Sequence, residues 1–391
     1  MRAFGPRSIF SKNNDASFDT LTAPMTNAPH IYCDPAIFAR EQAELFAQQW
    51  LYAGLTHELA AHNDFVRVNL AGRDVIIQNL HGDLHAFINV CSHRHSIIHD
   101  TPCGNRPLTC PYHGWHYNAE GTPVGIPCKK AFPAVTANPQ AFNLQKLEVA
   151  KAGDFVFVRM NPGESDLPTF LGDAYDFLTK VSAGLDQCID THESHIQANW
   201  KIVIENSLEG YHVPLVHRSS LAKATEIQFS QENEDSLEFM PPTGHSSVNN
   251  KANKKWLERW SRYQNDIGQW PFMFEHYVHR LVFPNLTVTS FLGYSFHVQH
   301  FRPNGVDSTT VYSKIFSAKF HNQTPRGKII MQSIMKENIH FTHLIFQEDK
   351  LACERTQQGS AQATRPSIPG EIIEQRVSDF RKTYARLQPL E

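Results

Sequence analysis

The chain has 391 residues, of which 41% are hydrophobic and 19% are charged, and its formal net charge is -3 at pH 7. This balance is typical of globular proteins, and the length allows two domains with separate cores. Nothing in the charge indicates nucleic-acid binding, and no apolar run approaches the roughly 18 residues of a membrane span. The N-terminus lacks the apolar segment of a signal peptide, so we expect a cytoplasmic protein whose residues 1–28 form a mobile or docking arm.

Histidine and cysteine are the residue types that suggest chemistry. The chain contains 22 His and seven Cys. An odd, scattered set of cysteines without a signal peptide argues against a disulfide framework. Metal ligation is then the hypothesis to test.

The first predicted element is a helix over residues 34–50. Asp34 can cap its N-terminus, and Pro35 suits its first turn. From residue 50 to 160 the pattern changes to short alternating or β-branched runs separated by turns such as His81-Gly82-Asp83. We predict a small all-β domain for this region.

The second half of the chain mixes helices and strands. Helical patterning is predicted over 165–215, and long strands over 281–319 with a hairpin at Pro303-Asn304-Gly305, because Asn-Gly tolerates the positive φ of a tight turn. Further helices are predicted at 328–350 and 370–386. This mixture suggests an α+β domain.

Four potential metal ligands lie in two short motifs. Cys91 and His93 form a C-x-H motif, and Cys110 and His113 form a C-x-x-H motif. Two thiolates and two imidazoles suit either zinc or a Rieske [2Fe–2S] cluster, in which one iron takes both Cys and the other takes both His. Zinc fingers usually pair Cys with Cys and His with His, so one Cys and one His in each motif favours the cluster.

These two motifs resemble the Rieske motif of ring-hydroxylating and demethylating oxygenase α subunits. The matching stretches are Asn89-Val-Cys-Ser-His-Arg and Cys110-Pro-Tyr-His-Gly-Trp, and they depart from the family at His95, where Gly is usual. Respiratory Rieske proteins add two cysteines at positions that are Ser96 and Tyr112 here, so the resemblance implies the lower-potential oxygenase type. Four other cysteines are interpreted as packing or surface thiols: Cys33, Cys103, Cys128 and Cys188.

The resemblance also implies a domain organisation. Residues 49–162 would form the all-β Rieske [2Fe–2S] domain, inserted near the N-terminus of a helix-grip-like catalytic domain made of an antiparallel sheet and helices. Residues 1–48, the arm and first helix, would belong to that catalytic domain together with residues 163–391, which would hold a mononuclear iron.

A second set of candidate ligands lies in the segment 199–217. Read as one helix, this segment has a stripe at i, i+3, i+4 and i+7 formed by Glu205, Leu208, Glu209 and His212. A second, core-facing stripe consists of Trp200, Val203, Ile204, Ser207 and Tyr211. Carboxylates and a His on a buried helix need a partner, and a metal would supply it. Pro214 is expected to end the helix, which lets His217 approach His212 from the following turn.

Two His and one carboxylate form the facial triad of non-heme Fe(II) oxygenases. The resemblance implies that the carboxylate is Asp349, with its neighbour Glu348 as the alternative. It also implies that Glu209 bridges the two centres by hydrogen bonding a cluster His and an iron His, with His113 and His212 as expected partners. In the family the cluster of one chain faces the iron of the next, which implies a cyclic homotrimer.

The expected activity follows from these cofactors. No flavin or nicotinamide motif is present, so electrons must come from a separate flavin- and NAD(P)H-dependent reductase, with or without a ferredoxin. We expect a terminal oxygenase that uses O2 to hydroxylate or oxidatively demethylate a small organic substrate, with cis-diol formation on an aromatic ring as the alternative. Glu209, where most ring-hydroxylating members have Asp, resembles the carnitine and betaine demethylating group.

Several alternatives stay open. The aromatic residues of 256–277 form either a cation–π cage for a quaternary ammonium or ordinary core and lid packing, and Phe291, Tyr294 and Phe296 are candidates to line an aromatic pocket. Two other protein classes remain: a Rieske electron carrier, and a zinc-stapled binding protein without a redox role.

Overall fold

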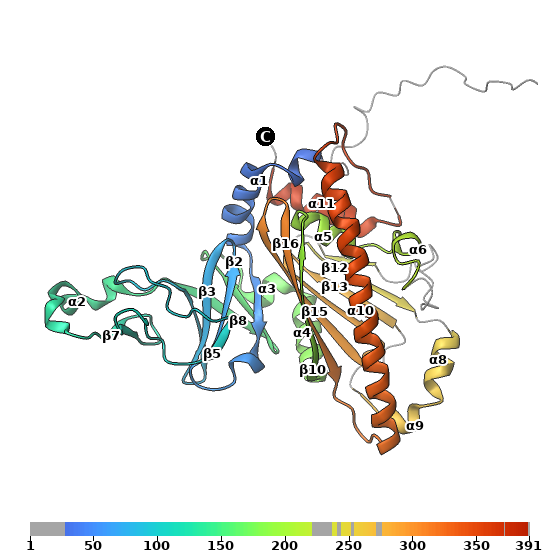
Figure 1. Cartoon of the computed structure of the whole chain (residues 1–391), viewed down its shortest axis with the longest axis horizontal. Coiled ribbons are helices and arrows are strands. Elements are labelled where there is room, and N and C mark those ends of the chain that lie inside the picture. Colours follow the sequence, from blue (N-terminus) through green and yellow to red (C-terminus); the bar gives the residue numbers. More distant parts are fainter. Residues whose placement is uncertain are drawn as a thin grey trace, which may run out of the picture.

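The computed structural model describes residues 28–220, 237–240, 244–251, 254–270, 276–370 and 372–389. In Figure 1 the chain forms two sheets, with the first half of the chain at the left. A long helix crosses the face of the second sheet that is turned away from the first sheet. Within the described residues, no helix is both long enough and apolar enough to cross a bilayer.

The first sheet is antiparallel, with strand order β1-β9-β8-β4-β3-β2-β5. Its strands are β1 (Leu51–Leu55), β2 (Asp64–Leu70), β3 (Arg73–Leu80), β4 (Asp83–Ile88), β5 (Cys103–Asn105), β8 (Lys146–Ala152) and β9 (Phe155–Arg159). His81 and Gly82 join β3 to β4 with φ angles of 62° and 100°, which confirms the predicted turn. The predicted all-β domain is therefore present.

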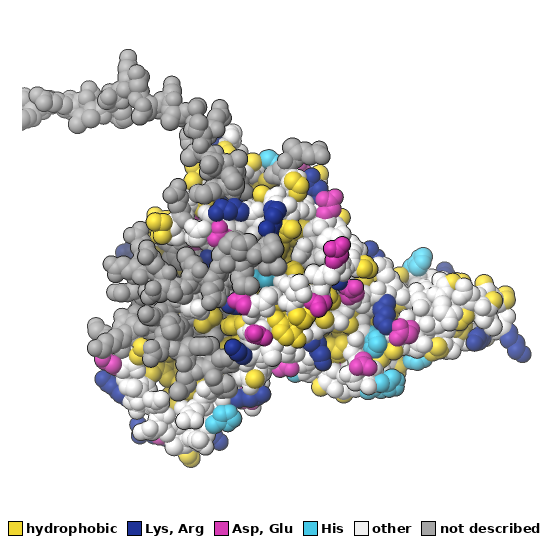
Figure 2. Space-filling model, turned by 180° about the vertical axis from the view of Figure 1, so that it is seen from behind, with side chains coloured by type: hydrophobic (Ala, Val, Ile, Leu, Met, Phe, Trp, Pro, Cys, Tyr) yellow, Lys and Arg dark blue, Asp and Glu magenta, His cyan; other side chains and the backbone are white. Residues whose placement is uncertain are grey.

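An extension projects from this first sheet and forms the left end of the molecule in Figure 1. It contains a two-stranded ribbon, β6 (His116–Tyr117) with β7 (Pro123–Gly125), and the short helix α2 (Pro133–Ala137). Lys129 and Lys130 are exposed between β7 and α2. Dark blue side chains gather at this end in the space-filling view of Figure 2.

The second sheet is also antiparallel, with strand order β10-β16-β15-β14-β13-β12-β11. Its strands are β10 (Leu185–Ile196), β11 (Leu237–Met240), β12 (His245–Lys251), β13 (His276–Val282), β14 (Leu286–Phe291), β15 (Ser295–Gly305) and β16 (Ser308–Ala318). The strands predicted over 281–319 are thus confirmed, and with the helices below they give the predicted α+β catalytic part.

Two details of that prediction are wrong. Helical structure was expected throughout 165–215, but Leu185–Ile196 is an edge strand, β10. Because β10 pairs only with β16 and is largely polar, it lacks the apolar alternation that identifies a strand in a sequence. The predicted hairpin is present between β15 and β16, but its turn lies at Val306 and Asp307 instead of Asn304-Gly305, and Gly305 still pairs with Ser308.

The helices of the second half are α3 (Leu167–Leu171), α4 (Asp173–Gly184), α5 (Trp200–Ser207), α6 (Val213–Val216), α8 (Lys254–Ser261), α9 (Gln264–Ile267), α10 (Pro325–Ser360) and α11 (Gln375–Leu387). One face of the second sheet is apolar: Val288 and Phe296 share a core with α4 and with Phe157 of the first sheet. The opposite face meets α10, where the side-chain amide of Asn338 donates to the Ser295 hydroxyl at 3.0 Å. The molecule is therefore layered as first sheet, second sheet and long helix (Figure 1).

The N-terminal segment was predicted as one helix over 34–50, and the structure divides it. A 3-10 turn, η2 (Pro29–Tyr32), precedes α1 (Pro35–Arg40), η3 (Glu41–Leu45), which is wound as a π-helix, and η4 (Phe46–Gln48), again 3-10. Asp34 caps α1 as predicted, accepting from the backbone N–H of Ala36 at 2.7 Å. The winding changes at Glu41, whose carboxylate is fully buried.

Candidate metal centres

The two Rieske-type motifs form loops that are closed by the same hydrogen bonds. The backbone N–H of Cys91 donates to the carbonyl of Ser96, and that of Cys110 donates to Trp115. In each loop the fourth residue after the Cys donates back to the Cys carbonyl. Both cysteines are buried, with 1% of their surface exposed. The backbone thus presents two equivalent thiols from two matching loops.

The imidazoles of the two loops lie against each other. The ring centroids of His93 and His113 are 4.6 Å apart, and the His93 ring stacks on Trp115 at 4.7 Å. The Nδ1 atom of His93 is buried and has no hydrogen-bond partner. A buried ring nitrogen without a partner is unusual unless it serves a ligand. The structure therefore brings together all four residues that the sequence predicts to bind the cluster.

Burial raises the pKa of the Cys91 thiol, against a hydrogen bond with the Tyr117 hydroxyl at 3.0 Å. Thiolates are the form that binds metal, so this environment calls for a cationic partner to offset the buried charge. Tyr117 also contacts Ser92, and sequence reasoning missed it, because an isolated Tyr on β6 carries no motif. All seven cysteines are free, as expected, so Ser96 and Tyr112 stand in loops without a disulfide.

The departure at His95 has a local explanation. His95 has a φ of 58° and is exposed, and Gly114, at the same place in the other loop, has a φ of 72°. Both residues occupy the left-handed turn that closes their loop, which is the conformation that favours glycine. His95 therefore fills a turn position and is exposed to solvent.

The second candidate centre is formed by His212, His217 and Asp349. Ligand atoms of these three side chains all lie within 4.8 Å of one another. His212 and His217 flank α6, and Asp349 comes from the middle of α10, so segments far apart in the sequence meet here. The two His positions and the late Asp that the sequence analysis selected are brought together by the fold.

The local structure around His212 differs from the prediction. Helix α5 ends at Ser207, so Glu209 and His212 lie in the turns that follow it, and Pro214 occupies the first turn of α6. Tyr211, predicted to be core, is 65% exposed.

The three ligand atoms are arranged as a metal would require. His212 Nδ1 contacts the Glu209 carboxylate, and His217 Nδ1 lies 2.8 Å from Glu348 Oε2. Each Nδ1 then carries the proton, which leaves a lone pair on each Nε2. These Nε2 atoms are 3.2 Å apart, and His217 Nε2 is 3.0 Å from Asp349 Oδ1.

Two Nε2 nitrogens and a carboxylate oxygen that converge on one point need a cation between them, which is a proton on Nε2 in the free protein or a bound metal ion in its place. Asp349 Oδ1 is buried, and it lies 3.0 Å from His217 Nε2 and 3.5 Å from His212 Nε2. Burial acts to lower the pKa of His212, yet hydrogen bonds with Asp349 and Glu209 raise it to about 9. The hydrogen bonds from His212 and His217 outweigh the effect of burial and lower the pKa of Asp349 to about 2. The chemistry of this donor set fits a divalent iron.

Other acidic residues of the predicted stripe take different roles. Glu205 pairs with Arg381 at 2.8 Å and accepts from the Tyr32 hydroxyl at 2.9 Å, so it holds the N-terminal segment and α11 together. Glu348 contacts His217 only at Nδ1, the nitrogen that faces away from Asp349. The neighbouring hydroxyls of Ser219 and Ser220 also donate to Glu348, a contact that no sequence motif signals.

The aromatic candidates lie elsewhere. Trp260 stacks on Tyr294 with centroids 4.8 Å apart, and the Trp270 indole N–H donates to the carbonyl of Leu292 at 2.9 Å. Phe296 lies on the sheet face that packs against α4. The side chains of Trp256, Phe272, Phe274 and Phe291 lie outside the described residues.

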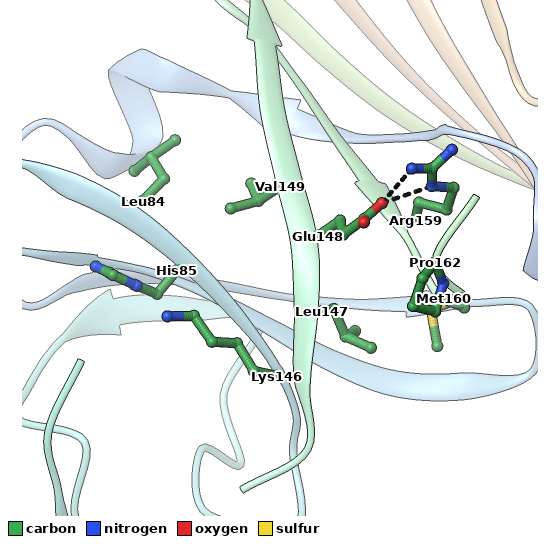
Figure 3. A pocket seen from close by; sticks show the side chains of 9 residues that line it. All are labelled: Leu84, His85, Lys146, Leu147, Glu148, Val149, Arg159, Met160 and Pro162. Atoms are coloured by element: carbon green, nitrogen blue, oxygen red, sulfur yellow. Dashed lines mark hydrogen bonds and ion pairs between the residues drawn. The ribbon is translucent and has the colours of Figure 1, made fainter. Parts of the chain in front are cut away.

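A groove of about 460 Å³ lies on the first sheet, between β4, β8 and β9. In Figure 3 its charged residues Glu148 and Arg159 point toward each other, and their side chains are hydrogen bonded at 2.6 Å. Lys146, also in its wall, pairs with Glu120. Its charges are already neutralised, and it contains none of the candidate ligands, so it is separate from both centres.

Comparison with known families matches both halves of the chain. Residues 187–389 match the catalytic domain of ring-hydroxylating alpha subunits, and residues 49–145 match the Rieske [2Fe–2S] domain. The first match covers more than half of the chain and includes His212, His217 and Asp349. The second includes Cys91 and Cys110 with their two histidines.

Curated relatives include oxygenases of two kinds. The glycine betaine monooxygenase oxygenase subunit of Chromohalobacter salexigens is 34% identical over 192 residues, 48% of this chain and 42% of the relative. The chloroplastic choline monooxygenase of Beta vulgaris is 26% identical over 352 residues, 87% of this chain and 71% of the relative. The large oxygenase component of naphthalene 1,2-dioxygenase from Pseudomonas putida is 30% identical over 223 residues, 55% and 49% of the two chains. The first relatives are matched over less than half of their length.

Solved structures share the fold of the whole chain. The quaternary ammonium Rieske monooxygenase CntA in complex with L-carnitine superposes with a TM-score of 0.73 at 17% identity, covering 94% of this chain and 97% of that one. Naphthalene 1,2-dioxygenase with bound indole gives 0.74 at 20%, covering 93% and 92%. The two matched domains imply one [2Fe–2S] cluster and one mononuclear iron. The chain therefore belongs to the ring-hydroxylating alpha-subunit family and is a Rieske-type non-heme iron oxygenase.

Proposed function

We propose that the protein is a terminal oxygenase component that hydroxylates a C–H bond of a small polar substrate carrying a methylated ammonium group. In this reaction one oxygen atom of O2 enters the C–H bond and the other leaves as water, with two electrons and two protons supplied. The electrons come from a separate flavin- and NAD(P)H-dependent reductase, directly or through a ferredoxin. The observation that carries this proposal is the convergence of two Nε2 lone pairs and Asp349 Oδ1 on one point.

The ligand assignment follows from the same geometry. His212, His217 and Asp349 would hold the mononuclear iron, and an iron held by these three residues would supply the oxygen chemistry of the reaction. The Rieske cluster would be held by Cys91 and Cys110 on one iron and by His93 and His113 on the other. Glu209 fixes the ring of His212 through its Nδ1–H, which keeps Nε2 directed at Asp349.

The substrate class is supported by the chemistry of the sheet face opposite α4. Thr289 and His297 are paired neighbours on this face, and His279 is paired with Thr289. On the other face the equivalent positions are apolar, for example Val288 and Val298. His279 Nδ1 lies 3.1 Å from Arg376 Nη2, but its buried Nε2 has no partner among the described residues. A buried polar atom without a partner is costly, so this face suits a polar substrate better than a bare aromatic hydrocarbon. Relatives that act on glycine betaine and choline agree with this direction.

The two centres lie on opposite sides of the folded protomer. In Figure 1 the extension with β7 and α2 is at the far left, and α6 is at the right beyond the second sheet. Large apolar side chains are exposed beside each centre: Tyr112 next to the cluster loop is 56% exposed, and Leu215 on α6 is 83% exposed. These side chains are available for contact with another protomer. We infer a head-to-tail homotrimer in which the cluster of one protomer faces Glu209 and the iron of its neighbour.

The metal assignment is tested by changing Asp349 to Ala. This variant should lose the mononuclear iron and all substrate oxidation, while the labile sulfide and the visible absorption of the cluster stay at parent levels. Retention of full iron and turnover in this variant, with loss in a Glu348→Ala variant, would move the ligand by one residue. Zinc without labile sulfide in anaerobically purified protein would contradict the cluster assignment.

The substrate assignment is tested by oxygen uptake with a surrogate reductase. Quaternary ammonium compounds should stimulate oxygen uptake, and one molecule of hydroxylated or demethylated product should form for each O2 consumed. Naphthalene and anthranilate serve as the comparison, because two of the relatives are 1,2-dioxygenases named for these aromatic compounds. Stimulation by these compounds alone, with a cis-diol as product, would contradict the proposal.

A further inference from the structure

Glu348 lies beside the iron site in a position that the ligand assignment leaves without a role. Its Oε2 is 2.8 Å from His217 Nδ1 and also accepts from the Ser220 hydroxyl, while Oε1 accepts from the Ser219 hydroxyl at 2.9 Å. His217 is 1% exposed and Ser220 is 3% exposed. The carboxylate is thus held by both oxygens and directed at the edge of one imidazole.

Neighbouring residues of α10 contact opposite edges of the same ring. Side chains of consecutive residues leave a helix in directions roughly 100° apart. Asp349 consequently lies 3.0 Å from His217 Nε2, while Glu348 reaches Nδ1 on the other side. A carboxylate on Nδ1 cannot also bind a metal at Nε2, so Glu348 is excluded from the ligand set by its direction.

We propose that Glu348 is a positioning residue that fixes the orientation and tautomer of His217, so that Nε2 is presented to the mononuclear iron. This inference rests on the iron site proposed above. By holding the proton on Nδ1 and placing a negative charge beside it, Glu348 makes Nε2 a stronger electron-pair donor. The hydroxyls of Ser219 and Ser220 hold the Glu348 carboxylate in place, and they thereby support the orientation of His217 indirectly.

The arrangement gives each iron-binding histidine its own carboxylate. Glu209 holds His212 from the same loop, whereas Glu348 holds His217 from a different element, α10. His217 is therefore locked to the helix that also supplies Asp349. Because both contacts come from consecutive residues, a shift of α10 would move the ligand and the brace together.

The test measures metal binding rather than turnover. The mononuclear iron is removed while the cluster is kept, and Co(II) is titrated into the parent protein and into Glu348→Gln, Glu348→Ala and Ser220→Ala. Two quantities are recorded: the Co(II) affinity by competition with a chelator, and the visible absorption bands of bound Co(II), which report ligand geometry. Glu337→Gln is the matched control, because Glu337 is an exposed acid on the same helix.

Removal of a partner that orients a metal-binding His typically weakens metal binding about 10- to 100-fold. We expect Glu348→Ala to weaken Co(II) binding about 10- to 100-fold and to change its absorption bands. Glu348→Gln should lose less, since an amide oxygen still accepts the Nδ1 proton, and Ser220→Ala should shift both readouts in the same direction. The Glu337→Gln control should match the parent in both.

The outcomes separate this inference from the proposed iron site. If Glu348→Ala binds Co(II) like the parent, with the same bands, while Asp349→Ala does not bind it, the positioning role is wrong and the iron site stands. If Asp349→Ala binds Co(II) normally, the iron site itself is wrong. The absorption of the cluster shows whether each variant is folded, and if Glu348→Ala loses it, Glu348→Gln decides by the same two readouts.

Discussion

Individual residues carry most of the chemistry of this protein, and several do so through their backbone conformation. The two cluster loops have the same closure, and each needs one residue in the left-handed region, at His95 and at Gly114. A residue with a Cβ is strained there, which costs roughly 1–2 kcal/mol. The first loop accepts this strain, whereas Gly114 avoids it.

Replacement of His95 by Gly should therefore stabilise the protein. We expect the free energy of unfolding to rise by up to about 1 kcal/mol, because relief of strain is partly offset by the greater freedom of glycine in the unfolded chain. Iron and labile sulfide should not change, since His95 is exposed and is not a ligand. Denaturant unfolding of the holoprotein measures the first quantity and metal analysis the second.

Gly114→Ala is the matched comparison. A Cβ at this position would be strained by the φ of 72° and would approach Pro127 Cγ to 3.3 Å. We expect it to destabilise the protein by about 1 kcal/mol or more. A loss of cluster in His95→Gly would show instead that the imidazole supports the iron–sulfur site.

At the scale of elements, a buried charge network attaches the N-terminal segment to the catalytic part. Glu41 of η3 accepts from Lys201 Nζ at 2.5 Å, from the Trp200 indole N–H at 2.8 Å and from the Tyr384 hydroxyl at 2.6 Å. Both charged side chains are essentially fully buried. The carboxylate thus joins three elements, η3, α5 and α11, that are distant in the sequence.

Change of Glu41 to Ala should leave Lys201 as an unpaired buried charge. Burial already lowers the pKa of Lys201, and loss of its partner should cost about 3–5 kcal/mol of stability. The exposed pair of Lys146 and Glu120 is the control, because Lys146→Ala should cost less than about 1 kcal/mol. Chemical denaturation compares the two, and equal costs would show that the buried pair has no special weight.

In the molecule as a whole, the extension with β7 and α2 lies on the other side of the second sheet from α6 (Figure 1), so the proposed electron route runs between neighbouring protomers. Glu209 accepts from backbone N–H groups of its own loop and contacts His212 Nδ1, so one side of its carboxylate is already engaged locally. A neighbouring cluster would have to approach from the exposed side, where Tyr211 lies. The proposed trimer supplies that approach.

Replacement of Glu209 by Gln should uncouple the centres without dismantling them. Both metal centres should assemble, and the donor should still reduce the cluster at the parent rate, because Glu209 is not a proposed ligand. Substrate oxidation should fall by at least tenfold, since the amide weakens the anionic acceptor between the two histidines. Stopped-flow reduction of the cluster and single-turnover product yield separate these effects, and parent-like product yield would argue against a bridge.

The trimer has its own test, in which defective subunits are mixed. Protomers with Cys110→Ala lack a cluster, and protomers with His212→Ala lack the iron site. In mixed trimers an intact cluster can face an intact iron on the next protomer, so part of the activity should return. Absence of activity in mixed trimers verified by mass, together with full activity of an isolated monomer, would leave Glu209 as a local partner of His212.

The residues that carry the chemistry could be predicted from the amino-acid sequence, whereas parts of the geometry of the protein could not. The two Cys-His motifs predicted four residues that meet in matching loops, because their spacing is local and a loop needs only a few residues to form. The mixed α+β class and the strands of 281–319 also followed from local patterning. The polar edge strand β10 did not, because an edge strand is identified by its partner β16 and not by its own residues.

The role of each carboxylate near the iron site depends on how the chain packs in three dimensions. Glu205, Glu209, Glu348 and Asp349 are all carboxylates near predicted helices, and nothing in their local sequence separates them. The fold pairs Glu205 with Arg381 and directs Asp349 to the two Nε2 atoms, and it leaves Glu348 on the far edge of His217. Such roles depend on direction and distance between segments far apart in the chain, and these are fixed only when the second sheet, α10 and the loop after α5 pack together.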